Sequence, residues 1–283
     1  LRDRIKNWAM KRVIEDMGSL SKLRPEDFMR FRSYLSRVVR LSDVDRDRRE
    51  NIPPQLLSKK RAGAVCLEAL LVDHIYTNII NCPFFVLKDQ QLSLQALVHQ
   101  LQELSWSDFA QATRKESHLW RSKMVRLLSS PPAGNQGGQA EGRGYAERRA
   151  AICSNLTIAF YEGPAWRLMK TVDNEEGKRS LDELKSIVQY AGEMSSQLWS
   201  RKTFFRVLGL PELKNRPFSV TSKEMEAHAL NLLDDEEDDN CNGMLVHVVV
   251  HSLVFGYGSS DGIDHEKPGV WVKATLWLNE ETE

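Results

Sequence analysis

Apolar residues recur at three- and four-residue intervals along most of the chain before residue 234, which predicts a mainly α-helical protein. The first such stretches span residues 3–17 and 25–39. The second stretch opens with Pro25, a residue that is favoured in the first turn of a helix. A third stretch runs from about 54 to 81 and is apolar on nearly all sides beyond residue 62. Helices of that kind lie inside a protein, so we expect residues 62–80 to form the central helix.

Residues 62–80 also approach the length that would cross a membrane. They include Glu68, Asp73, His74 and Asn78, and charged or polar groups at that depth are costly in lipid. The composition therefore favours a core helix over a membrane span.

A break between two helical regions is predicted at residues 129–144, where two prolines and five glycines occur without a large apolar residue. Such a segment cannot bury enough apolar surface to hold one conformation, so we predict a mobile loop or linker. Helical periodicity resumes at Tyr145. We therefore expect an N-terminal helical lobe at 1–128 and a second lobe at 145–233, packed against the first.

Within the second lobe, the Gly-Pro pair at 163–164 should interrupt a helix. Ser180 and Glu183 have the spacing of a capping box, which predicts a long helix from Ser180 to about residue 208. The same spacing recurs before a shorter predicted helix at 221–233.

The pattern changes after residue 233. Residues 234–243 begin with six consecutive acids and should form a linker. Residues 244–255 are rich in β-branched side chains, and residues 270–278 alternate in polarity with the period of a strand. The two segments predict a β-hairpin at 244–283. The fold class that follows is mainly α: an irregular multi-helix bundle closed by a C-terminal β-hairpin.

Charge and cysteine content limit the kinds of function and the cell compartments that the sequence favours. The 283 residues carry 39 basic and 39 acidic side chains, so net charge gives no general argument for nucleic-acid or membrane-surface binding. The four cysteines show no CxxC spacing and no disulfide framework, which favours a reducing, intracellular compartment, nuclear or cytoplasmic. No signal peptide is visible at the start of the sequence, and no motif predicts a cofactor.

The hairpin offers the first candidate site, and its register decides which residues are presented. We favour the arrangement that buries both aliphatic faces against the helices and leaves the polar tips hydrated. The outer face would then be a partner-binding surface of aromatic, histidine and lysine side chains. Its members are His247, His251, Trp271, Lys273 and Trp277.

A second candidate is the long loop between the hairpin strands. Asp261, Asp264 and His265 could supply oxygen and imidazole ligands to a divalent cation. The loop matches no known metal or phosphate motif, and glycines and aspartates are also ordinary turn residues. We therefore take the loop as structural and keep metal-dependent catalysis as an alternative.

A third candidate is a positively charged helix face in the first lobe, with Trp120 nearby. Such a face could bind phosphate or nucleic acid, although solvated charged faces are common on helices. Its members are Arg114, Lys115, His118, Arg121, Lys123 and Arg126.

The segment GYGSSDGIDHE followed by VWVKATLWL resembles the ends of uncharacterised proteins of filamentous fungi, and the early IKNWA segment (5–9) is similar to segments of the same group. The resemblance implies an intracellular eukaryotic interaction protein and assigns no residue a role. No serine, histidine and acid stand in a spacing that a catalytic mechanism requires. We therefore predict a non-catalytic helical scaffold that docks a partner protein or peptide, without a membrane.

Overall fold

The computed structural model of the protein describes residues 1–14, 17–41, 61–87, 111–129, 136–229, 231 and 241–279. The acidic stretch at 234–239 lies outside these residues. The description that follows concerns the described part of the chain.

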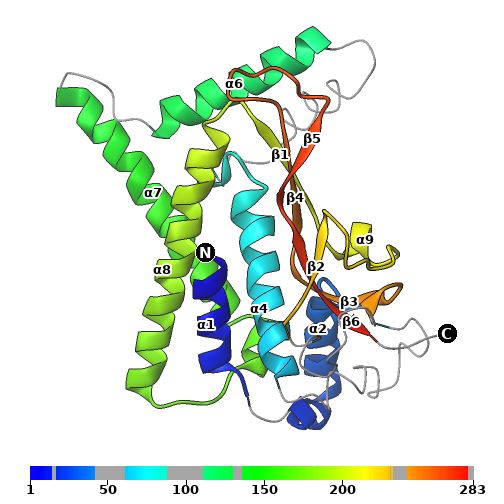
Figure 1. The fold of residues 1–283 in the computed structure, drawn as a ribbon. Coiled ribbons are helices and arrows are strands. Elements are labelled where there is room, and N and C mark those ends of the chain that lie inside the picture. The colour runs from blue at the N-terminus through cyan, green and yellow to red at the C-terminus, as the bar shows by residue number, and fades with distance from the viewer. Residues whose placement is uncertain are drawn as a thin grey trace.

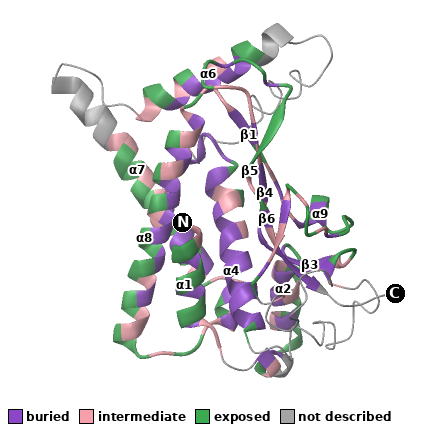
Figure 2. Ribbon diagram, in the orientation of Figure 1, coloured by how far each residue is buried: buried purple, intermediate pink, exposed green. Residues whose placement is uncertain are grey.

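The central helix is α4 (Ala62–Ile75), which continues into a π-helical turn, η2 (Tyr76–Ile80). Every residue of α4 except Asp73 is buried, and the helix runs through the middle of the fold (Figures 1 and 2). The segment Ala62–Ile80 is long and apolar enough to cross a membrane, and most of it is buried within the fold. The prediction of a core helix here is confirmed.

The other helices surround α4. Helices α1, α7 and α8 lie on one side of it, and α6 crosses one end of the fold (Figure 1). The helical elements are α1 (Arg2–Arg12), η1 (Met17–Lys22), α2 (Pro25–Leu35), η3 (Phe85–Leu87), α6 (Gln111–Ser129), α7 (Gln136–Tyr161), η4 (Pro164–Leu168), α8 (Asn174–Trp199) and α9 (Leu210–Leu213).

Two three-stranded sheets lie on the opposite side of α4 (Figure 1). The first has the order β1-β4-β5, with all neighbours antiparallel. The second has the order β2-β6-β3, with β2 parallel to β6 and β3 antiparallel to it. The strands are β1 (Phe204–Leu208), β2 (Met225–Ala227), β3 (Leu245–His251), β4 (Leu253–Tyr257), β5 (Pro268–Val272) and β6 (Ala274–Asn279).

The predicted hairpin is present as the antiparallel pairs β4–β5 and β3–β6. Two further strands extend it, so the fold combines a helical body with two small sheets. The long helix expected from Ser180 to 208 ends at Trp199, and β1 follows at residues 204–208. The helix expected at 221–233 contains strand β2 instead. Both predictions were wrong because pairing with distant strands outweighed weak local helix signals.

Two helix starts also differ from the prediction. Helix α7 begins at Gln136, inside the segment 129–144 that was expected to be a loop, and residues 130–135 lie outside the described residues. Helix α8 begins at Asn174, because the Asp173 carboxylate caps it by accepting a hydrogen bond from the Glu176 amide at 2.8 Å.

A continuous apolar core joins α4 to the helices on one side and to the sheets on the other. It contains residues from both of the expected lobes, such as Trp8 and Phe31 from the first and Phe160 and Trp199 from the second. A smaller apolar cluster lies between α9 and the second sheet. All four cysteines are free and buried.

Candidate docking groove

The five residues predicted to form one outer face of the hairpin do not lie on one surface. His247, His251 and Trp277 are buried, whereas Trp271 and Lys273 are exposed. Strand β3 is covered on both faces, and two irregularities in its pairing with β6 interrupt the alternation of side chains. The predicted aromatic and histidine face is therefore wrong.

The buried members of that set have structural contacts. His251 Nε2 donates a hydrogen bond to Glu68 Oε1 at 2.9 Å, which pairs β3 with the central helix. The rings of His247 and Trp277 meet edge to face with their centroids 6.2 Å apart. These side chains fasten the second sheet to α4 and are not available to a partner.

Trp271 is 44% exposed, and it occupies a bulge in β5. Val254 pairs with Val272 and Phe255 with Val270, so Trp271 is the extra residue. Its ring lies over Gly256, where a Cβ atom would come within 1.8 Å of the indole. The bulge thus lays one side of the ring on the sheet and leaves the rest in solvent.

The Gly/Asp loop does not bring its candidate ligands together. Asp261 and Asp264 are exposed, and Asp264 adopts a positive φ of 59° as a turn residue. His265 is buried instead, stacked on His118 with centroids 4.6 Å apart, and it donates to the Lys202 carbonyl at 3.2 Å. Among the described residues, no group of three potential ligands is placed to hold a metal ion.

The basic face of α6 turns inward at its centre. Arg121 is 2% exposed and donates to the carbonyls of Arg201 and Thr203 at 2.7 and 2.8 Å. Burial lowers the pKa of this guanidinium to about 9. Arg126 donates in the same way to the Ser200 carbonyl at 2.9 Å. These arginines hold the segment that joins the C-terminal end of α8 to β1.

The other residues predicted for that face are partly exposed and partly buried. Lys115 and Lys123 are exposed, His118 is buried, and the Arg114 side chain lies outside the described residues. The outward part of this face therefore consists of Lys115, Lys123 and Arg126, because His118 and Arg121 are buried.

A further candidate is a shallow, open depression on the surface. An open groove of about 560 Å³ lies between α2 and η4. We call it the docking groove, and its lining combines apolar and cationic side chains. They are Met29, Arg30, Ser33, Tyr34, Arg37 and Pro164. Met29 is 48% exposed, which is high for a side chain of this size and apolarity.

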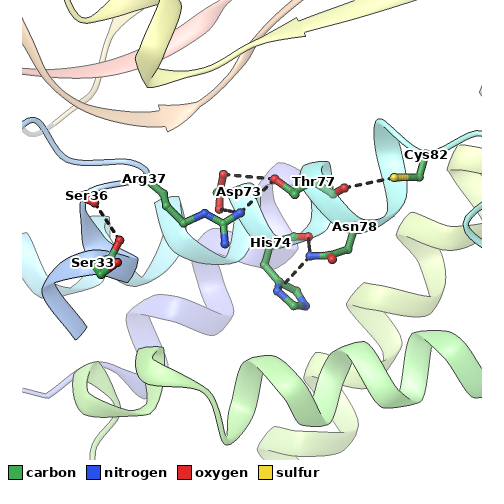
Figure 3. Close-up of polar contacts among 8 residues, drawn as sticks. All are labelled: Ser33, Ser36, Arg37, Asp73, His74, Thr77, Asn78 and Cys82. Atoms are coloured by element: carbon green, nitrogen blue, oxygen red, sulfur yellow. Dashed lines mark hydrogen bonds and ion pairs between the residues drawn. The ribbon is translucent and has the colours of Figure 1, made fainter. Parts of the chain in front are cut away.

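Arg37 at one end of the docking groove is held in place by α4. Its Nη2 lies 2.8 Å from Asp73 Oδ2 and donates to the Thr77 hydroxyl at 3.2 Å (Figure 3). Its guanidinium also lies over the Tyr34 ring, 5.4 Å from the centroid. Burial raises the pKa of Asp73, and the arginine opposes that shift. Thr77 belongs to the π-helical turn, a distortion often found at functional sites.

Asp27, which lies three residues before Arg30 in α2, already pairs with two other arginines. Asp27 lies 3.0 Å from Arg24 Nε and 3.1 Å from Arg167 Nη2, and the hydrogen bond from Arg24 is the main cause of its lowered pKa. Arg30 forms no direct ion pair with any residue that the structure describes, but its charge contributes to the lowered pKa of Asp27, three residues before it. Trp166, beside the groove in η4, is exposed and carries the Arg167 guanidinium 3.9 Å above its ring.

Sequence reasoning missed the docking groove. The groove residues of α2 stand on the polar side of a correctly predicted helix, where the only unusual signal is the apolar Met29 next to Arg30. The other wall comes from Pro164, which is distant in sequence. No family model, curated protein or solved structure matches this chain.

Proposed function

We propose that this protein is a non-catalytic interaction module that docks an acidic segment of a partner protein in the groove between α2 and η4. The observation that carries the proposal is the lining of that groove, in which the exposed Met29 and the half-buried Tyr34 and Pro164 stand beside two arginines and no acid.

The apolar part of the groove supplies an anchor site. Met29, Tyr34 and Pro164 are contributed by two elements that pack against each other, so they form one continuous surface. Methionine adapts its shape to irregular ligands and recurs at binding surfaces, and tyrosine is enriched at binding hot spots. One apolar side chain of the partner would rest here.

Charge complementarity supports an acidic partner. Arg30 has no ion pair among the described residues, and Arg37 has one, to Asp73. An arginine without a direct ion pair, such as Arg30, attracts a carboxylate at the edge of an apolar surface, and the two can form a bidentate hydrogen bond. A basic partner would meet repulsion from Arg30, whereas the charge of Arg37 is offset by Asp73.

The setting we infer is intracellular, nuclear or cytoplasmic, which the four free, buried cysteines support. The resemblance to fungal proteins belongs to this same proposal. The two alternatives, metal-dependent catalysis and nucleic-acid binding, lack a comparable site: His265 and Arg121 are both turned into the fold.

The test is a random-peptide display screen against the full immobilised chain, repeated with two matched variants. Met29→Glu adds an acid inside the groove. Met10→Glu adds the same acid on α1, where the methionine is 46% exposed and lies outside the groove. We expect peptides that bind the natural chain and the Met10→Glu variant to lose at least tenfold in binding to Met29→Glu. Equal binding to both variants would refute the proposal.

A further inference from the structure

The long loop between β4 and β5, residues 258–267, is held against the body of the protein through one buried side chain. The loop lies beside α6 (Figure 1). His265 is 7% exposed, and apart from Gly262 it is the only buried residue of the loop. Ile263, the one large apolar residue there, is 50% exposed. At Gly258, where φ is +80°, a Cβ atom would come within 2.6 Å of the His265 ring, so the loop backbone lies directly on that ring.

The contact of this side chain with α6 is a second buried histidine. The His265 ring stacks on that of His118 with centroids 4.6 Å apart and an interplanar angle of 27°. His118 also stacks on Phe204 of β1, with centroids 5.1 Å apart. His265 Nε2 donates to the Lys202 carbonyl at 3.2 Å, and Lys202 Nζ adds an exposed contact to the Asp261 carbonyl at 3.5 Å. The imidazole pair therefore forms the buried contact between the loop and α6.

A buried positive charge lies next to this stack. Arg121 follows His118 by one helical turn and is 2% exposed. It donates to the carbonyls of residues 201 and 203, and His265 donates to the carbonyl of residue 202 between them. The other charged side chains near the stack on these three segments are exposed or half-buried, so water screens their effect on the rings. They are Lys115, Glu116, Arg201, Lys202, Asp261, Asp264, Glu266 and Lys267.

We propose that the stacked pair of His118 and His265 is a pH-sensitive switch that releases the 258–267 loop from α6 in mild acid. An imidazole in water takes up a proton near pH 6.5. In the closed arrangement, a proton on either ring would place a positive charge in a buried position beside Arg121. Protons on both rings would place two positive charges 4.6 Å apart. Burial and like charge both disfavour the charged form of a histidine.

The direction of the pH effect follows from this difference. The closed loop binds fewer protons than the released loop, in which both rings reach water. Closure is therefore most stable above about pH 6.5 and weakens as the pH falls below that value. Release would uncover the His118 ring, which is 5% exposed in the closed arrangement, so the pH would change the surface that this end of the fold presents.

The experiment follows a nitroxide spin label on the full chain by electron paramagnetic resonance between pH 7.5 and pH 5. Ser260→Cys places the label on the exposed part of the loop, and Lys185→Cys places a control label on the exposed face of α8. The four natural cysteines are buried, so the introduced thiol reacts selectively. At residue 260 we expect the mobile fraction to rise about threefold or more at pH 5 and to return on neutralisation, with no change at residue 185.

His118→Phe, carrying the same label at residue 260, keeps a stacked ring that binds no proton. We expect its loop to be immobile at pH 7.5 and its mobile fraction to rise by less than half as much at pH 5, since one titrating ring remains. An equal rise in both chains, no rise in the natural chain, or a rise at residue 185 as well would overturn the proposal. Histidine ring NMR of the natural chain gives a second measurement. A release midpoint that follows neither the His118 nor the His265 titration would also overturn it.

Discussion

Trp271 and Trp277 provide the sharpest test of how the two sheets are built. The residues are six positions apart on consecutive strands, and the alternation of the sequence predicts them on one exposed face. In the structure, Trp277 is 2% exposed and Trp271 is 44% exposed. Replacing each by alanine removes the same atoms from two different environments.

The expected costs follow from those environments. Trp277→Ala should lower the free energy of unfolding by about 3–5 kcal/mol, the range for truncating a buried aromatic side chain, because the ring packs against His247 and belongs to the main core. Trp271→Ala removes a ring that touches the sheet through one side, over Gly256. A loss of about 1 kcal/mol is expected there, typical of a point substitution away from the core.

Urea unfolding followed by far-ultraviolet circular dichroism measures both costs without using tryptophan fluorescence, which the substitutions themselves would change. The variants should share one slope with urea concentration and differ in midpoint. If Trp271→Ala proved as destabilising as Trp277→Ala, the burial assigned to the two strands would be wrong.

Three further predictions concern single contacts. Asp173→Ala should cost about 1 kcal/mol in urea unfolding by removing the α8 cap. Glu68→Ala should cost about 3–5 kcal/mol, since it leaves His251 buried without its acid, and Glu68→Gln should cost less in the same assay. Burial lowers the pKa of His74 to about 4, so roughly 3 kcal/mol of stability, present above pH 6.5, should be lost as the pH falls to 4. His74→Gln should show a flatter pH profile.

Local periodicity was enough to predict the helices whose buried faces repeat within one segment. Phe28, Phe31 and Leu35 of α2 are buried at the expected spacing, and α4 is buried almost completely. Strand β1 could not be predicted in this way, because Phe204 and Phe205 follow a long helix without a turn signal. Only pairing with β4, about fifty residues later, makes this segment a strand.

The predicted candidate sites differ from the structure for a related reason. The basic stripe of α6 was correctly located, yet its orientation depends on carbonyl groups at residues 200–203, far from α6 in the sequence. The outer face of the hairpin depended on a strict alternation, which bulges on both strands interrupt. In each case the sequence pattern predicted which side chains are neighbours on one element. Contacts with another element determined whether those side chains point outward or into the fold.

The same reasoning explains why Arg30 stands out in a chain whose charges balance. Arg121 Nη2 donates to two backbone carbonyls, Arg37 pairs with Asp73, and Asp27 pairs with two arginines. Each of these side chains has a direct polar partner within the fold. Arg30 has no ion pair among the described residues and lines an apolar groove. A cation without a direct ion pair on such a surface contributes little to the stability of the fold itself. Under the function proposed above, Arg30 would pair with an acidic group of the partner.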